Sequence, residues 1–231
     1  MLIKGLQKTS LIDFPPYLAS VIFTGGCSFR CGFCHNPDLV LHFDKLKTIS
    51  EEEVFEYLEE KKNWIDGVVI TGGEPTLQKD LVEFMSRIKS MGLLLKLDTN
   101  GSNPDMLKEI IDKKIVDYIA MDVKTRLEDY EKVVGVKVDV DKIKRSILLI
   151  RDSGIDYEFR TTVIPGIIGK EEVASIGELL KGSKKYVLQN FRNSAGLIDE
   201  KFKEINPYSE KELEELKNVV ADKFETVEIR K

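Results

Sequence analysis

Residues 19–36 read ASVIFTGGCSFRCGFCHN, a short apolar run that leads directly into a loop with three cysteines. The run Ala19–Phe23 is typical of a parallel strand that is covered on both faces. Helical patterns separate it from six further β-rich runs, so repeated βα units and a parallel sheet are expected, either open and doubly wound or curled into a barrel. The six runs are Gly67–Thr71, Leu93–Asp98, Asp117–Asp122, Tyr157–Val163, Lys185–Gln189 and Thr226–Ile229.

Three helix starts can be recognised between these runs. Ser50 with Glu53, and Ser209 with Glu212, have the spacing of a capping box. Asn103–Pro104 supplies an N-cap followed by proline at the first helical position. Residues 126–153 contain two helical patterns, with a turn expected over Gly135–Val140.

Composition limits the class of protein. The chain has 231 residues, of which 42% are hydrophobic and 32% charged, and its formal net charge is −5. Such a chain can bury a core, which excludes a disordered, collagen-like or coiled-coil protein. Mild acidity gives no general attraction for nucleic acid or anionic membrane. No apolar run approaches the length of a membrane-spanning helix. Asp13, Pro15 and Pro16 interrupt the one apolar stretch that could be a signal peptide. We expect a soluble, intracellular protein with one domain over residues 1–231.

The cysteines predict a metal site. Cys27, Cys31 and Cys34 are the only cysteines, and an odd number within eight residues does not suit a disulfide framework. Three thiolates can bind three irons of a 4Fe–4S cluster and leave the fourth iron without a protein ligand, whereas ordinary electron-transfer clusters use four cysteines. The alternative is structural zinc held by the three cysteines and His35. Zinc sites usually take ligand pairs from separated segments, so this compact loop fits zinc poorly.

Polar or glycine-rich residues follow six successive strands. Because active sites of α/β folds form at the carboxyl ends of the strands, these segments predict one shared site. Besides the cysteine loop they are Gly72–Pro75, Asp98–Gly101, Asp122–Lys124, Arg160–Gly166 and Gln189–Arg192.

These motifs resemble those of a known family. CxxxCxxC with Phe33 before its last cysteine, followed by Gly-Gly-Glu-Pro at 72–75, resembles the radical S-adenosylmethionine enzymes. Lys8–Pro15 and Cys34–Pro37 are similar to the activating proteins of anaerobic ribonucleoside-triphosphate reductase, which are related to pyruvate formate-lyase activating enzymes. The likeness runs from Gly5 to about Arg192. It implies a partial, open α/β barrel of about six βα units, with its core at about 17–192 and a helix and strand at 208–230.

The resemblance also implies cofactors and their ligands. Cys27, Cys31 and Cys34 would hold one 4Fe–4S cluster, whose open iron binds the amino and carboxylate groups of S-adenosylmethionine. Gly72, Gly73 and Glu74 would receive the methionine ammonium. Lys124 would receive its carboxylate. Asp98, Thr99 and Asp122 would share a monovalent cation, unless the aspartates form ordinary ion pairs with lysine.

Other residues have less specific implied roles. Phe33 and the segment Val163–Pro165 would pack on the adenine, with a core aromatic as the alternative for Phe33. His35 would donate to a cluster sulfide or be a simple loop residue. Arg160, Gln189 and Arg192 would face the same mouth and contact S-adenosylmethionine or the partner.

The activity implied by the resemblance is glycyl radical formation in a partner protein. An electron from the cluster cleaves S-adenosylmethionine, and the 5′-deoxyadenosyl radical removes hydrogen from a glycine Cα, so no general acid or base is required. Anaerobic ribonucleotide reductase would be the partner, with a flavodoxin or ferredoxin-type electron donor, in the cytoplasm. Alternatives are activation of pyruvate formate-lyase or another glycyl radical enzyme, radical chemistry on a small molecule, and a non-enzymatic zinc or adaptor protein.

Overall fold

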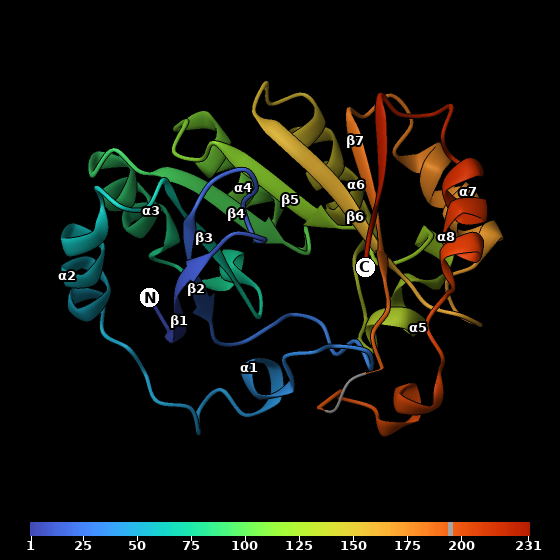
Figure 1. The fold of residues 1–231 in the computed structure, drawn as a ribbon, viewed down its shortest axis with the longest axis horizontal. Coiled ribbons are helices and arrows are strands. Elements are labelled where there is room, and N and C mark those ends of the chain that lie inside the picture. The colour runs from blue at the N-terminus through green and yellow to red at the C-terminus, as the bar shows by residue number, and fades with distance from the viewer. Residues whose placement is uncertain (194–195) are drawn as a thin grey trace.

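One curved sheet of eight strands, in the order β1 to β8, organises the chain (Figure 1). The computed structural model describes residues 1–193 and 196–231. β1 is antiparallel to β2, and every later pair is parallel. All seven expected strands form, with small differences at their ends. The strands are Ile3–Ser10 (β1), Ala19–Thr24 (β2), Gly67–Gly72 (β3), Leu94–Thr99 (β4), Tyr118–Asp122 (β5), Asp156–Val163 (β6), Lys185–Asn190 (β7) and Thr226–Arg230 (β8).

Helices connect the parallel strands, and their starts follow the sequence signals. The Ser50 side chain accepts from the Glu53 amide, Asn103 caps its helix in the same way, and Ser209 forms the full capping box with Glu212. The helices are Pro37–Leu41 (α1), Glu51–Lys61 (α2), Leu81–Ser90 (α3), Pro104–Asp112 (α4), Tyr130–Val134 (α5), Val140–Arg151 (α6), Lys170–Leu179 (α7) and Glu210–Asn218 (α8), with short 3-10 turns at Pro75–Leu77 (η1), Leu127–Asp129 (η2) and Glu200–Glu204 (η3).

The first strand was not expected from the sequence. β1 is polar along much of its length, and only its two end residues, Ile3 and Ser10, are buried. It forms because the edge of β2 offers antiparallel pairing, for example between Leu6 and Ile22. The sheet therefore has eight strands, and β1 and β8 are its two edges. This arrangement confirms six βα units in an open, partial barrel rather than a closed one.

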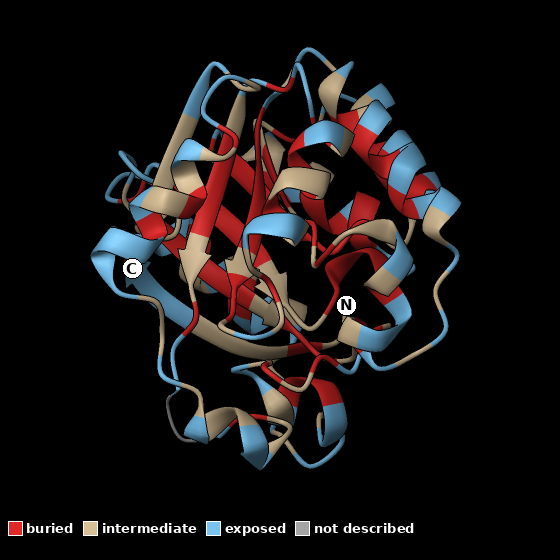
Figure 2. Ribbon diagram, turned by 90° about the vertical axis from the view of Figure 1, so that its right-hand side faces the viewer, coloured by how far each residue is buried: buried red, intermediate tan, exposed pale blue. Residues whose placement is uncertain are grey.

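The core lies between the sheet and the helices outside it. Figure 2 shows buried residues concentrated on the strands and on the helix faces turned toward them. Fully buried side chains such as Ile70 on β3 and Met85 and Ile88 on α3 belong to one large apolar cluster. Removal of this surface from water stabilises the fold by about 25 cal/mol per Å². The packed outer layer leaves the carboxyl ends of the strands available for a site.

The segment between β1 and β2 covers part of the inner face of the sheet. Phe14 packs with Val21 and Val69 in a second apolar cluster, and its ring centroid lies 5.9 Å from that of Tyr118 on β5. The Lys96 ammonium, on β4, donates to the carbonyl oxygen of Asp13 and holds the segment against the sheet. One part of the barrel interior is thus filled by the chain itself.

Charged residues line the inner face near β8. The Glu158 carboxylate accepts two hydrogen bonds from Arg230, at 2.9 and 2.8 Å, and a third from the Tyr118 hydroxyl at 3.1 Å. Burial acts to raise the pKa of Glu158, but the hydrogen bonds from Arg230 and the charges of Arg160 and Arg230 outweigh it and lower that pKa to about 2. The ion pair therefore holds β8 to the sheet across β7.

Replacing Glu158 by glutamine should remove an acid-sensitive part of the stability. The carboxyl pKa rises from about 2 in the folded chain to its usual 4.5 on unfolding, so this contribution is complete above pH 4.5 and is lost as pH falls toward 2. At neutral pH we expect Glu158→Gln to lower the free energy of unfolding by roughly 3 kcal/mol. Urea unfolding between pH 2 and 7 would measure the difference between wild type and variant. Glu228→Gln, which changes a more exposed neighbouring carboxylate, is the control. If the free energy of unfolding of Glu158→Gln depended on pH as steeply as that of the wild type, the assignment would be contradicted.

Within residues 1–193 and 196–231, none of the helices has the length and apolar character needed to cross a membrane.

Candidate active site

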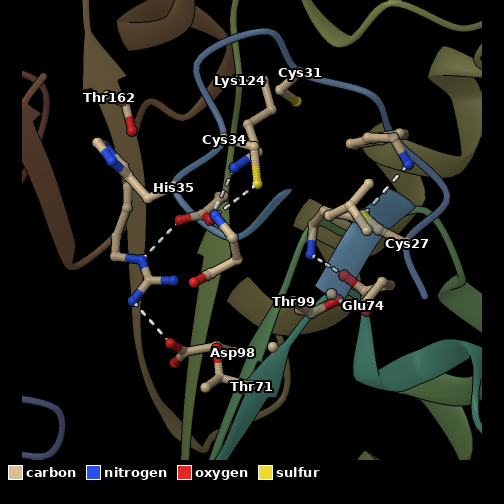
Figure 3. A pocket seen from close by; sticks show the side chains of 18 of the residues that line it. Cys27, Cys31, Cys34, His35, Thr71, Glu74, Asp98, Thr99, Lys124 and Thr162 are labelled. Atoms are coloured by element: carbon tan, nitrogen blue, oxygen red, sulfur yellow. Dashed lines mark hydrogen bonds and ion pairs between the residues drawn. The ribbon is translucent and has the colours of Figure 1, made fainter. Parts of the chain in front are cut away.

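A cavity of about 480 Å³ opens at the carboxyl ends of the parallel strands. Its size suits a ligand of roughly drug-like dimensions. Figure 3 shows its side chains surrounding a common space, with His35 and Thr162 on one side and Cys27, Thr99 and Glu74 on the other. The structure brings together most of the residues predicted from the sequence. Those that line the cavity are Cys27, Cys31, Phe33, Cys34, His35, Gly72, Gly73, Glu74, Asp98, Thr99, Asp122, Lys124, Arg160 and Gln189.

The loop after β3 is joined to the cysteine loop by its backbone. The Gly73 amide donates to the Thr24 carbonyl at 2.9 Å, and the Glu74 amide donates to the Gly26 carbonyl at 2.8 Å. Gly72 has φ +119°, and a Cβ at Gly73 would lie 1.9 Å from the Gly26 carbonyl oxygen. The two glycines are thus required for close contact between two loops, and this contact fixes the start of the cysteine motif.

Glu74 joins the loop after β3 to the loop after β4. Its carboxylate is buried and accepts from the Thr76 amide and hydroxyl, from the Thr99 hydroxyl at 2.7 Å and from the Asn100 amide at 2.6 Å. Burial raises the pKa of Glu74, and the donors from Thr76, Asn100 and Thr99 oppose this effect. The position of the carboxylate is therefore determined before any ligand binds. Its contact with a methionine ammonium stays a prediction.

The cysteine sulfurs have nearby hydrogen-bond donors. The Phe29 amide lies 3.4 Å from Cys27 Sγ, and the Asn36 amide lies 3.4 Å from Cys34 Sγ. Burial, with the charge of Glu74, raises the pKa of Cys27 to about 12, and burial raises that of Cys31 to about 11. A bound metal must therefore supply the charge that keeps these thiols ionised.

The donor set fits an iron–sulfur cluster better than a single zinc ion. In the part of the chain that the structure describes, no three His, Cys, Asp or Glu side chains converge as ligands of one metal ion. Zinc would need its sulfur ligands about 2.3 Å from one point. The three cysteines instead line one larger cavity and receive N–H donors, which are typical of thiolates around a cluster.

Charged residues occupy the end of the cavity formed by β4, β5 and β6. The Lys124 ammonium lies 2.9 Å from an Asp122 oxygen. Burial favours the neutral form of each, but Arg160 and Lys124 hold the pKa of Asp122 well below its usual value, and Asp122 raises the pKa of Lys124. All three groups are charged at neutral pH. This end of the cavity can therefore attract an anionic group such as a carboxylate.

The remaining residues that were predicted from the sequence do not all line the cavity. Phe33 is buried, and its ring centroid lies 5.9 Å from that of Phe202. Gln189 and His35 line the cavity, and burial together with the charge of Arg192 lowers the pKa of His35. Arg192 itself is exposed and donates to the Lys231 carbonyl instead of lining the cavity. Val163–Pro165 is not part of the lining either, so its contact with adenine stays a prediction.

Other lining residues had no individual role assigned from the sequence, although Asn100 and Thr162 lie in the segments Asp98–Gly101 and Arg160–Gly166 that predicted the site. Asn100 donates through Nδ2 to Cys27 Sγ at 3.7 Å and to the Ser28 hydroxyl at 3.0 Å, while its amide holds Glu74. The signal for Asn100 was its place directly after Thr99 at a strand end. Thr71 and Thr162 line the wall from β3 and β6, and Asp13 lines it from the segment between β1 and β2. Asp13 precedes the first strand expected from the sequence, so only the fold reveals its position.

Comparison with known proteins shows the family to which this chain belongs. Residues 21–180 match the model of the radical SAM superfamily. A Methanocaldococcus jannaschii protein named for the glycyl-radical enzyme activating enzymes is 36% identical over 99% of this chain and 95% of its own length. The pyruvate formate-lyase-activating enzyme of Clostridium pasteurianum is 28% identical over 78% of this chain and 76% of its own. This chain belongs to the radical SAM superfamily and, within it, to the glycyl-radical enzyme activating enzymes.

Solved structures support the fold. Streptococcus suis SuiB superimposes with a TM-score of 0.70 at 16% identity, covering 91% of this chain and 48% of that one. A domain of the pyruvate-formate lyase-activating enzyme from Bacteroides vulgatus gives a TM-score of 0.54 at 17% identity, over 70% of this chain and 98% of that one. By its family, and not by this likeness of fold, the chain is an oxidoreductase-type enzyme of a superfamily that uses a 4Fe–4S cluster and S-adenosylmethionine.

Proposed function

We propose that this chain forms a glycyl radical on anaerobic ribonucleotide reductase. The observation that carries the activity is the single cavity in which three cysteines, the Gly72–Glu74 turn and the charged group around Lys124 meet. The choice of partner rests on the resemblance of Lys8–Pro15 and Cys34–Pro37 to activating proteins of that reductase. Pyruvate formate-lyase or another glycyl radical enzyme is the alternative partner, since the relatives include activating enzymes of that kind.

The residues of the cavity would divide the binding of the cofactors. Cys27, Cys31 and Cys34 would hold the cluster, and the Gly72–Glu74 turn and Lys124 would hold the methionine part of S-adenosylmethionine. When bound, the cluster supplies the electron that cleaves the carbon–sulfur bond of S-adenosylmethionine. The protein contributes position and shielding from water, and a flavodoxin or ferredoxin-type protein would supply the electron in the cytoplasm.

The open sheet suits a macromolecular substrate. β1 and β8 are edges that do not pair with each other in the described chain, so the sheet does not close into a complete barrel. Small-molecule radical chemistry would be better served by a closed cavity that excludes water. The incomplete barrel favours the loop of a partner protein as the substrate.

Cys31→Ala tests the cluster assignment. This variant should lose cluster iron and all cleavage of S-adenosylmethionine, because no other cysteine can replace the lost ligand. Iron content and deoxyadenosine formation would be measured anaerobically after reconstitution. Leu41→Ala, an exposed position on α1, is the control and should behave as wild type. Full iron loading and activity in Cys31→Ala would refute the assignment.

Electron spin resonance tests the partner. Reduced, reconstituted protein would be mixed with S-adenosylmethionine and either anaerobic ribonucleotide reductase or pyruvate formate-lyase. A glycyl doublet on the reductase alone is the expected result. Deoxyadenosine without that doublet would keep the radical chemistry and reject this partner, and a doublet on the lyase alone would establish the alternative.

A further inference from the structure

The guanidinium group of Arg160 lies between Asp98 and Asp122, the two carboxylates that the family resemblance assigned, together with Thr99, to a monovalent cation. Arg160 and Asp122 are paired residues on adjacent strands, β6 and β5, and Asp98 is on β4. Arg160 Nε lies 2.8 Å from Asp122 Oδ1, and Nη1 lies 3.2 Å from Asp98 Oδ2. The Arg160 side chain is only 10% exposed, so the surrounding strands hold this bridge in place.

The charges around this bridge leave no need for an inorganic cation. Lys96 Nζ lies 3.4 Å from Asp98 Oδ1, and Lys124 Nζ lies 2.9 Å from Asp122 Oδ2. Glu158 also interacts with Arg160 and Lys96 and is paired with Arg230. Three carboxylates (Asp98, Asp122 and Glu158) therefore face four basic groups (Lys96, Lys124, Arg160 and Arg230), giving a local charge of 4 − 3 = +1. A sodium or potassium ion would add a second unbalanced positive charge in a poorly solvated place, which is unfavourable.

The oxygen atoms are also already occupied. Both Asp122 oxygens and one Asp98 oxygen accept hydrogen bonds from Arg160 or Lys124. Asp98 Oδ1 is buried and has no hydrogen bond, although it faces the Lys96 ammonium. The third residue assigned to the cation, Thr99, is also engaged: its hydroxyl donates to Glu74 and accepts from the Gly101 amide. One oxygen without a hydrogen bond is too few for an alkali cation, because hard cations bind several oxygen ligands at once. The residues present therefore do not fit a bound metal cation while Arg160 keeps this position.

We propose that Arg160 permanently takes the place of the monovalent cation, so that this chain binds S-adenosylmethionine without sodium or potassium. The inference rests on the proposed function to the extent that S-adenosylmethionine binds in this cavity. A planar guanidinium can pair with two carboxylates at fixed angles and does not dissociate. The excess positive charge that remains complements the carboxylate of the methionine part.

The first experiment compares salts. The dissociation constant of S-adenosylmethionine would be measured by equilibrium dialysis on the cluster-loaded wild type in about 0.1 M tetramethylammonium, sodium or potassium chloride, since equal ionic strength gives equal screening. Tetramethylammonium is too large to enter between the aspartates. The three constants should agree within about twofold, a difference well under 1 kcal/mol.

The second experiment removes the guanidinium group from between the two aspartates. Arg160→Gln should weaken binding about tenfold in tetramethylammonium, and sodium or potassium should restore most of that loss. Sodium-23 relaxation gives a readout independent of S-adenosylmethionine: the variant should broaden the sodium signal specifically, and the wild type should not. Arg192→Gln, an exposed arginine outside the cavity lining, is the matched control and should show neither effect.

Two results would overturn the inference. One is a wild-type affinity that falls tenfold or more in tetramethylammonium, since the folded wild type alone then demonstrates a need for the cation. The other is an Arg160→Gln variant in which neither sodium nor potassium restores binding of S-adenosylmethionine and the sodium-23 signal is not broadened. If Arg160→Gln does not fold, the wild-type salt series decides. Wild type that fails to bind S-adenosylmethionine in every salt would instead overturn the proposed function, and this inference with it.

Discussion

Replacing Gly73 by alanine should separate the loop after β3 from the cysteine loop and abolish tight binding of S-adenosylmethionine. The new Cβ would lie 1.9 Å from the Gly26 carbonyl oxygen and 2.6 Å from its carbon. Both atoms belong to backbone, so no side-chain rotation can relieve the overlap. The hydrogen bonds from Gly73 to Thr24 and from Glu74 to Gly26 should break. We expect a loss of roughly 3 kcal/mol or more in the free energy of unfolding.

Thermal and urea unfolding of the cluster-free protein would measure the stability part of this prediction. Equilibrium dialysis of the reconstituted variant should show at least about tenfold weaker binding of S-adenosylmethionine. Gly169→Ala is the matched control: its new Cβ would meet nothing nearer than 3.6 Å, and it should cost less than about 1 kcal/mol. Gly73→Ala with wild-type stability and affinity would show that the two loops are not in contact.

Glu74→Ala should have the second large effect. The substitution leaves the Thr76 amide and hydroxyl, the Thr99 hydroxyl and the Asn100 amide without their buried acceptor. These unsatisfied buried donors predict a destabilisation of roughly 3–5 kcal/mol. Binding of S-adenosylmethionine should weaken at least about tenfold. Iron content should stay at the wild-type value, because Glu74 is not a cluster ligand.

Parallel measurements separate the two roles of Glu74. Unfolding gives its structural contribution, and iron analysis with equilibrium dialysis gives its contribution to the site. Glu83→Ala, an exposed glutamate on α3, is the matched control and should change neither quantity. Unchanged affinity in a folded, iron-loaded Glu74→Ala would reject a role in ligand binding, even if the stability fell as expected.

The sequence predicts the parallel part of the fold because burial on both faces leaves a strong pattern. The apolar runs of β2 and β3 are visible without any structure, and Ser209 and Glu212 show where α8 begins. β1 has no such pattern. Its polar residues become a strand through pairing with β2, which is a tertiary effect. Local sequence therefore identifies the repeated units better than it identifies the edge.

The candidate site shows the same division. The sequence could predict that the cysteine motif and the residues at the strand ends lie together, because the carboxyl ends of parallel strands meet at one edge of the sheet. Partnerships between side chains could not be predicted in this way. Arg160 on β6 gives no sign in sequence that it bridges Asp98 and Asp122, and Asn100 gives none that it reaches Cys27 Sγ. These contacts depend on rotamers and strand register, which follow only from the packed fold.

The hydrogen-bonded contact between the Gly72–Glu74 turn and residues 24–26 also limits how the lengths of the two loops can change. Each inserted residue lengthens a chain by about 3.8 Å between consecutive Cα atoms. One insertion between Thr24 and Cys27 would displace the Cys27 sulfur relative to the turn at Gly73 and Glu74, which is hydrogen-bonded to this segment. An insertion in the turn would shift Glu74 away from Thr99 and Asn100 at the same time. Insertions and deletions at these two junctions should therefore be tolerated only as matched pairs.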